Sequence, residues 1–98
     1  MPKPIQELVI FHERIADGYS ELKAKISEKG DVVLDGADGG ERIRKLVGDW
    51  DSEYWVTVTK EWKDTVLLHL LKEKFDSTSA FMAWLKEREI PYDFYRWD

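Results

Sequence analysis

The residue pattern in the first third of the chain predicts β-strands. Residues 8–15, LVIFHERI, form a β-branched and aromatic run that ends at the turn dipeptide Asp17-Gly18. Residues 19–27 alternate apolar and polar side chains with the two-residue period of a strand. Their Glu, Leu, Lys and Ala side chains also suit a helix, but the turn before them favours a hairpin. A second turn at residues 29–31 leads into a short strand at 32–34.

Residues 35–41, DGADGGE, are predicted to form an irregular loop. The segment holds three glycines and two aspartates, which are the residues that most often interrupt regular structure. After it, Ile43, Leu46 and Val47 have the spacing of one helical turn, which Gly48 closes.

Residues 52–59, SEYWVTVT, have the clearest strand pattern of the chain. Alternation places Tyr54, Val56 and Val58 on one face and Trp55 on the other. This strand therefore carries a large aromatic side chain on each of its faces.

The apolar spacing changes to that of a helix over residues 60–75. Residues 76–79, DSTS, interrupt this helix and supply caps for a second one. In the second helix Phe81, Trp84, Leu85 and Arg88 recur at the spacing of one helical face. Pro91 prevents its continuation, and residues 92–97 alternate again, which predicts a last strand.

The predicted order of elements is β-β-β-(short α)-β-α-α-β. Strands early and helices late are typical of the α+β class. Short connections favour a mostly antiparallel sheet of four to five strands, and we expect the two helices of the C-terminal half to pack on one of its faces. Residues 1–98 are expected to form a single globular domain, since this length suits one hydrophobic core.

Composition narrows the range of partners. Charged residues make up 36% of the chain, the net charge is −5 and the pI is about 5.0. An acidic protein is repelled by phosphate groups, so we expect binding neither to nucleic acid nor to an anionic membrane. The same charge favours docking to a basic protein.

The chain has no cysteine, so it forms no disulfide and has no thiolate ligand or cysteine nucleophile. Its first residues lack the apolar core of a signal peptide, and no run approaches the roughly 18 apolar residues that span a bilayer. A soluble, cytoplasmic protein is expected.

Metal and catalytic sites have little support in the sequence. The acidic region around residues 35–41 lacks the ligand spacing of a calcium loop. His12 and His69 are far apart, and neither has the companion residues of a metal or catalytic motif. No sequence signature of a known catalytic or phosphate-binding site is present. We therefore predict no catalytic residue, no metal ligand and no cofactor.

The aromatic residues, 13% of the chain, are the most informative feature. Large rings usually fill the core. A sheet covered on one face leaves the rings on its other face exposed, and exposed Trp and Tyr side chains are common interface anchors. If the last strand lies beside residues 52–59, the uncovered rings form one ladder; rings paired across strands can also serve only to stiffen the open face. The members of this predicted ladder are Trp55, Tyr95 and Trp97.

The leading functional hypothesis is a protein-interaction module. The ladder would anchor a protein partner, and the nearby carboxylates of Asp49, Asp51 and Glu53 would attract a basic one. The size, acidity and α+β pattern resemble those of small bacterial immunity or inhibitor proteins, although many unrelated folds share these traits.

Two alternatives remain open. One is a small-molecule-binding or catalytic domain with a pocket between helices and sheet near Trp62 and Trp84. The other is self-association through the open sheet face.

Overall fold

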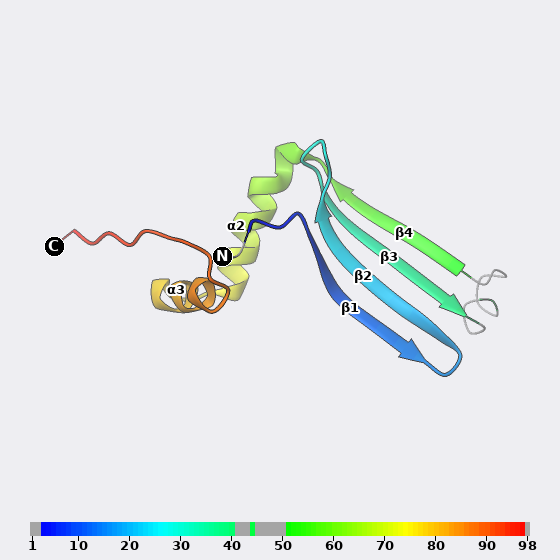
Figure 1. The fold of residues 1–98 in the computed structure, drawn as a ribbon. Helices are drawn as coiled ribbons and strands as arrows, with labels where there is room; N and C mark the ends of the chain where they lie inside the picture. Colours follow the sequence, from blue (N-terminus) through cyan, green and yellow to red (C-terminus); the bar gives the residue numbers. More distant parts are fainter. Residues whose placement is uncertain (1–2, 41–43, 45–50, 98) are drawn as a thin grey trace. The chain divides into compact units, whose positions relative to one another are not determined.

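The structure of the chain, a computed structural model, describes residues 3–40, 44 and 51–97. Backbone contacts divide the chain into two compact units. The sheet unit is Ile5–Asp64, and the helical unit comprises Thr65–Asp98 together with residues 1–4 (Figure 1). Each unit is described by itself below. The single domain expected over residues 1–98 stays a prediction.

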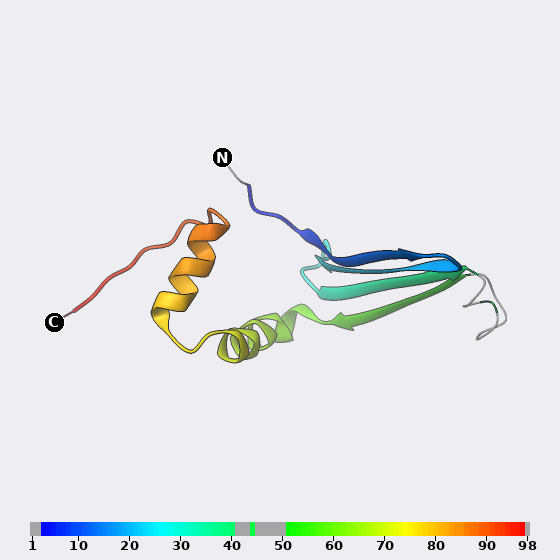
Figure 2. The ribbon, with the colours of Figure 1, turned by 90° about the horizontal axis from the view of Figure 1, so that it is seen from below.

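The sheet unit is built on four antiparallel strands in the order β1-β2-β3-β4 (Figure 1). Figure 2 shows them from the side as a single twisted layer. The antiparallel sheet is as predicted, and the two helices that follow it in the C-terminal half confirm the α+β class. The strands are β1 Glu7–Ile15, β2 Gly18–Ile26, β3 Val32–Gly40 and β4 Asp51–Val58.

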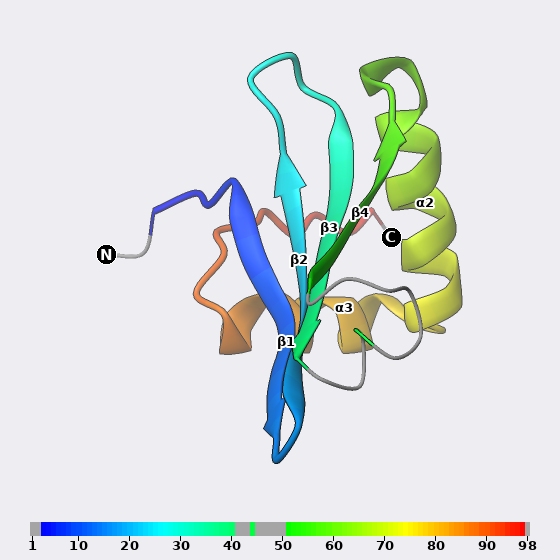
Figure 3. The same ribbon diagram turned by 90° about the vertical axis from the view of Figure 1, so that its right-hand side faces the viewer.

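The hairpin predicted around Asp17-Gly18 is confirmed, because β1 and β2 pair in antiparallel orientation. Residues 19–26, whose side chains also suit a helix, are part of strand β2. Strand β2 lies between two neighbours and is half-buried along its whole length, so its backbone groups are satisfied on both sides. The turn to β3, at the opposite end from the β1–β2 turn (Figure 3), is closed by two backbone hydrogen bonds between Ser27 and its neighbours, from Gly30 N at 2.8 Å and to Asp31 O at 2.9 Å. Gly30 has a φ of 92°, which glycine adopts without strain.

Residues 35–40 are a strand, so the loop predicted over residues 35–41 is wrong for these six positions. The physical reason lies in the neighbouring strands. A Cβ atom on Gly36 would overlap the ring of Tyr54, and one on Gly39 would overlap the ring of Tyr19. Each tyrosine therefore lies over a glycine that directly faces it in the register. Aromatic rings that cover strand glycines compensate for the missing side chains.

The register defines two different faces of the sheet. One, here called the apolar face, carries mainly Leu, Val, Ile, Ala and Phe side chains together with Tyr54. The other, here called the charged face, carries Lys, Glu, Asp, His and Arg side chains together with Trp55. The apolar face includes Leu8, Phe11, Leu22, Ala24, Ile26, Val32, Leu34, Tyr54, Val56 and Val58. The charged face includes Glu7, His12, Arg14, Tyr19, Glu21, Lys23, Lys25, Asp35, Asp51, Glu53 and Trp55.

The helix predicted over 60–75 is confirmed as a 3₁₀ turn, η1 Lys60–Trp62, continued by α2 Lys63–Lys74. The second helix is α3 Thr78–Glu87. Ser77 is its N-cap, and the Ser77 side chain accepts a hydrogen bond of 3.0 Å from the backbone N–H of Ala80. This satisfies a donor that the first turn of a helix otherwise leaves unpaired, as the cap-rich sequence predicts.

An aromatic cluster lies at the junction of α2 and α3. The ring centroids of Phe75 and Phe81 are 5.1 Å apart, and those of Phe75 and Trp84 are 5.8 Å apart in an edge-to-face arrangement. Leu85 on the same face of α3 is buried. Aromatic pairs at these separations are favourable beyond their burial, so the cluster holds the two helices together.

The last predicted strand is not present, because residues 90–97 have no helix or strand assigned. An extended segment becomes a strand only when a neighbour accepts its backbone hydrogen bonds, and alternation in sequence does not supply that neighbour. The helical turn predicted at residues 43–47 lies, apart from Arg44, outside the described residues. Packing of the helices on one face of the sheet stays a prediction.

Replacing Gly36 by alanine tests the tyrosine-over-glycine contact. We expect Gly36→Ala to lower the free energy of unfolding by about 1–3 kcal/mol, because the new methyl group displaces the Tyr54 ring. In a Tyr54→Ala background the same substitution should cost little, because the ring that it overlaps is gone. Urea denaturation of the four proteins measures this coupling. Equal costs in both backgrounds would show that the ring does not lie over Gly36.

Candidate interaction surface

Strand β4 places three of the predicted interaction residues on one face. Asp51, Glu53 and Trp55 are two residues apart and lie in a row on the charged face, opposite Gly39, Ala37 and Asp35 of β3. Tyr54 lies on the apolar face, so the predicted division of the two aromatic residues is confirmed.

The Trp55 side chain is open to solvent, with 56% of its surface exposed, and Asp51 and Glu53 are also exposed. Asp35, directly opposite Trp55, adds a carboxylate beside the indole. We call these four residues, Asp35, Asp51, Glu53 and Trp55, the anionic strip. An exposed indole among carboxylates is suited to a cationic side chain, which the ring attracts through its π face and the carboxylates through their charge.

Charges on this face are divided between its two halves. Within the described residues, the charged groups that β3 and β4 place on this face are all carboxylates of the strip. Strands β1 and β2 place glutamates there together with His12, Arg14, Lys23 and Lys25. The Lys25 ammonium lies 3.3 Å from the Asp35 carboxylate and joins the two halves. Glu21 lies 3.9 Å from both His12 and Lys23. The β1–β2 half is thus internally compensated, and the β4 end keeps its negative charge.

A polar network occupies one end of the apolar face. The Ser20 hydroxyl donates a hydrogen bond of 2.5 Å to Asp38, and the Tyr54 hydroxyl donates to the same carboxylate. Partial burial raises the pKa of Tyr54, and the negative charge and hydrogen bonding of Asp38 raise it further. The network therefore holds the Tyr54 ring over Gly36 with its hydroxyl protonated at neutral pH.

Much of the apolar face is exposed. Val56 has 58% of its surface exposed and Leu8 60%, and Phe11 and Leu34 are also exposed. A hollow of about 180 Å³ opens at one end of this face between Leu8, Ala24, Ile26 and Val32. Ligand pockets usually start near 300 Å³, so the hollow is small for a bound metabolite.

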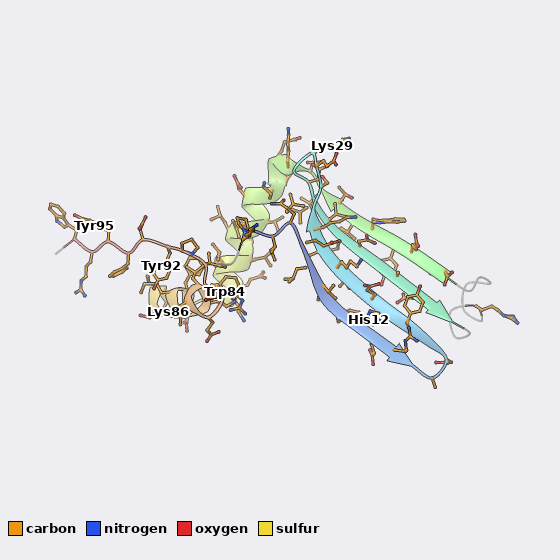
Figure 4. The ribbon with its side chains drawn as sticks, viewed as in Figure 1. His12, Lys29, Trp84, Lys86, Tyr92 and Tyr95 are labelled. Carbon is orange, nitrogen blue, oxygen red and sulfur yellow. The ribbon has the colours of Figure 1, made fainter. Side chains whose placement is uncertain are left out.

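The other members of the predicted ladder lie in the helical unit. Tyr95 and Trp97 are exposed in the segment after α3, where Figure 4 shows Tyr92 and Tyr95. The strand that was to align them with Trp55 is absent, so no pairing within the described residues joins the three rings. Asp49 lies outside the described residues.

The two tryptophans of the alternative pocket belong to different units. Trp62 ends η1 and is 60% exposed. Trp84, on α3 (Figure 4), packs against Phe75, and the Arg88 guanidinium lies 4.1 Å from the centroid of its ring. The predicted pocket between helices and sheet stays a prediction.

No metal site is evident in the described part of the chain, since no three His, Asp or Glu side chains converge there. His12 on β1 (Figure 4) faces Glu21, and His69 is exposed on α2. None of the described helices has the length and apolar character needed to cross a membrane.

Sequence reasoning missed Asp35 as a member of the strip. Residues 35–41 were expected to form a loop, and a loop gives no register that would place Asp35 opposite Trp55. The available signal was the pair of glycines at 36 and 39 with tyrosines at 19 and 54, a pattern suited to rings covering glycines in adjacent strands.

Comparisons with known proteins give no relative from which a role for these residues could be inferred. No family model, no curated protein and no solved structure matches this chain.

The raised pKa of Tyr54 makes stability depend on pH in the alkaline range. The folded chain holds the phenolic proton above the unfolded-state value of about 10, so the unfolded chain loses it first and the stabilisation falls as pH rises through that value. At pH 8 we expect Tyr54→Phe to cost about 1 kcal/mol of stability, a modest value because the group is partly exposed.

Urea denaturation of wild type and Tyr54→Phe between pH 8 and 11 measures this effect, and the difference between them should shrink above pH 10. In an Asp38→Asn background the dependence should weaken, because the carboxylate that opposes the phenolate is gone. A difference that stays constant with pH would contradict the assigned network.

Proposed function

We propose that this protein is a protein-interaction module that binds a basic protein surface through the anionic strip. The observation that carries the proposal is the register of β4, which aligns an exposed tryptophan with two carboxylates on one face of the sheet. Residues two apart on a strand stay in line, so the strip offers a partner a fixed row of contacts.

The chemistry of the strip favours an arginine or lysine side chain of the partner. A guanidinium stacks on an indole and also forms paired hydrogen bonds with a carboxylate. The stacking part of this contact occurs within this chain, where the Arg88 guanidinium lies over the Trp84 ring. The indole of Trp55 has Glu53 two residues away on the same face of β4, so both halves of such a contact are available. Asp35, opposite Trp55, is paired with Lys25.

Net charge supports the same class of partner. At −5 the chain attracts a basic surface over a distance set by the salt concentration. A basic surface that is covered by the strip is blocked for other acidic ligands, which is how the inhibitor-like role expected from the sequence would operate.

Truncation of Trp55 tests this function. The protein is immobilised and incubated with lysate, and captured proteins are quantified by mass spectrometry at 50 and 300 mM salt. We expect wild type to retain basic proteins at low salt, and Trp55→Ala and the double variant Asp51→Asn/Glu53→Gln to reduce their capture about tenfold or more. Trp62→Ala is the matched control, because Trp62 has a similar exposed fraction and lies outside the strip.

Two results would overturn the proposal. One is capture that is unchanged in Trp55→Ala and in the double carboxylate variant. The other is equal loss in Trp62→Ala, which would show that any exposed tryptophan serves and that the strip has no special role.

A further inference from the structure

Strand β4 lies at an edge of the sheet. Within the described residues its strand neighbour is β3, and its other side has no strand partner. Every second residue of an edge strand points its N–H and C=O groups away from the sheet, so β4 offers a template of eight residues for another strand.

The two edges of the sheet differ in how they are protected. The β1 edge is interrupted by an irregularity between Val9 and Phe11 and carries charges along its second half. Strand β4 pairs with β3 in unbroken register from Asp51 to Val58 and contains no proline. Bulges, prolines and charges are the usual means of blocking edge pairing, and the Tyr54–Val58 part of β4 has none of them.

The first residues after β4 lie on the side of the strand that faces β3. After Val58, the backbone N–H of Lys60 donates a hydrogen bond of 2.9 Å to Asp31 in the β2–β3 turn. The Lys60 side chain lies against Gly30 of the same turn. Lys60, two residues after β4, is therefore held on the β3 side of the strand, against the β2–β3 turn.

We propose that β4 pairs with β4 of a second copy, antiparallel about a twofold axis that passes beside Trp55. In this register Trp55 faces Trp55 of the second copy, Glu53 faces Thr57, and Tyr54 faces Val56. A shift by one residue would place Tyr54 opposite Trp55 and so join the apolar face of one copy to the charged face of the other. An axis that passes beside one residue, such as Trp55, pairs side chains of the same face, so the apolar and the charged faces each continue from one copy to the next.

For pairing with a second copy, the charges of β4 favour the antiparallel orientation over the parallel one. The carboxylates of β4 lie at one end, at Asp51 and Glu53, and the other end is uncharged. Antiparallel pairing about Trp55 separates the two Glu53 residues by four positions, about 14 Å, which exceeds the screening length of about 8 Å in physiological salt. Parallel pairing would bring identical carboxylates to about 5 Å. The strand is thus compatible with its own copy in one orientation.

Pairing over residues 52–58 adds about six to eight backbone hydrogen bonds and a cross-strand pair of indoles. It also extends the apolar face across both copies and places two anionic strips on one side of the joined sheet. The inference does not rest on the proposed function, because a dimer forms from the purified chain alone.

Introducing a charged side chain of either sign at position 55 and measuring the mass by analytical ultracentrifugation tests the dimer. Wild type at about 100 μM should sediment at twice the 11.6 kDa mass of one chain. Trp55→Lys and Trp55→Glu should each sediment as monomers, because like charges would then face each other across the axis. An equimolar mixture of the two variants should recover the dimer. Trp62→Lys is the control and should stay dimeric.

Single-cysteine cross-linking gives an independent readout in a chain that has no cysteine of its own. Under mild oxidation Trp55→Cys should form a covalent dimer, because directly opposed strand residues lie within disulfide reach. Thr57→Cys should not, since its copies are about 14 Å apart.

Several results would overturn the inference. A monomeric wild type at this concentration, a dimer that persists in Trp55→Lys, or equal cross-linking at positions 55 and 57 each contradicts the proposed pairing. The two proposals fail separately. A monomeric wild type leaves the capture result standing, and unchanged capture by the double carboxylate variant leaves the dimer standing, because Asp51 and Glu53 face neutral residues in it.

Discussion

The sheet depends on the contact between two tyrosine rings and two strand glycines. Gly36 and Gly39 leave room on β3 that the rings of Tyr54 and Tyr19 occupy, one on each face. Without the rings, an Asp- and Gly-rich segment would lose backbone entropy on becoming a strand and would gain little packing in return. With them, β3 extends to Gly40 and supplies a complete hydrogen-bonding partner for both β2 and β4.

The register that follows from this contact sets the chemistry of both faces. Because Gly36 faces Tyr54, Asp35 must face Trp55, and the carboxylates of Glu53 and Asp51 continue on the same side. The proposed strip and the proposed pairing edge are therefore two consequences of one alignment. The hydrogen bond from Tyr54 to Asp38 strengthens that alignment from the opposite face.

Local patterns predicted a large part of this structure. The hairpin, the strand over 52–59, the two helices and a cap within residues 76–79 follow from periodicity and capping, which act over a few residues. The extent of β3 was missed because cross-strand contacts override the turn preference of residues 35–40. The last strand, over residues 92–97, was predicted from alternation alone, and alternation does not supply the neighbour that a strand requires. The strip could be predicted only in part, since Asp35 joins it through the register.

The most direct test of this account is an NMR measurement on residues 35–40 and Tyr54. If the ring lies over Gly36, the Gly36 α-protons should be shifted upfield by the ring current and should show NOEs to the Tyr54 ring protons, and the amides of residues 35–40 should have strand-like couplings. Random-coil shifts over these residues, with no NOE between Gly36 and Tyr54, would contradict the register on which the strip and the pairing edge both depend.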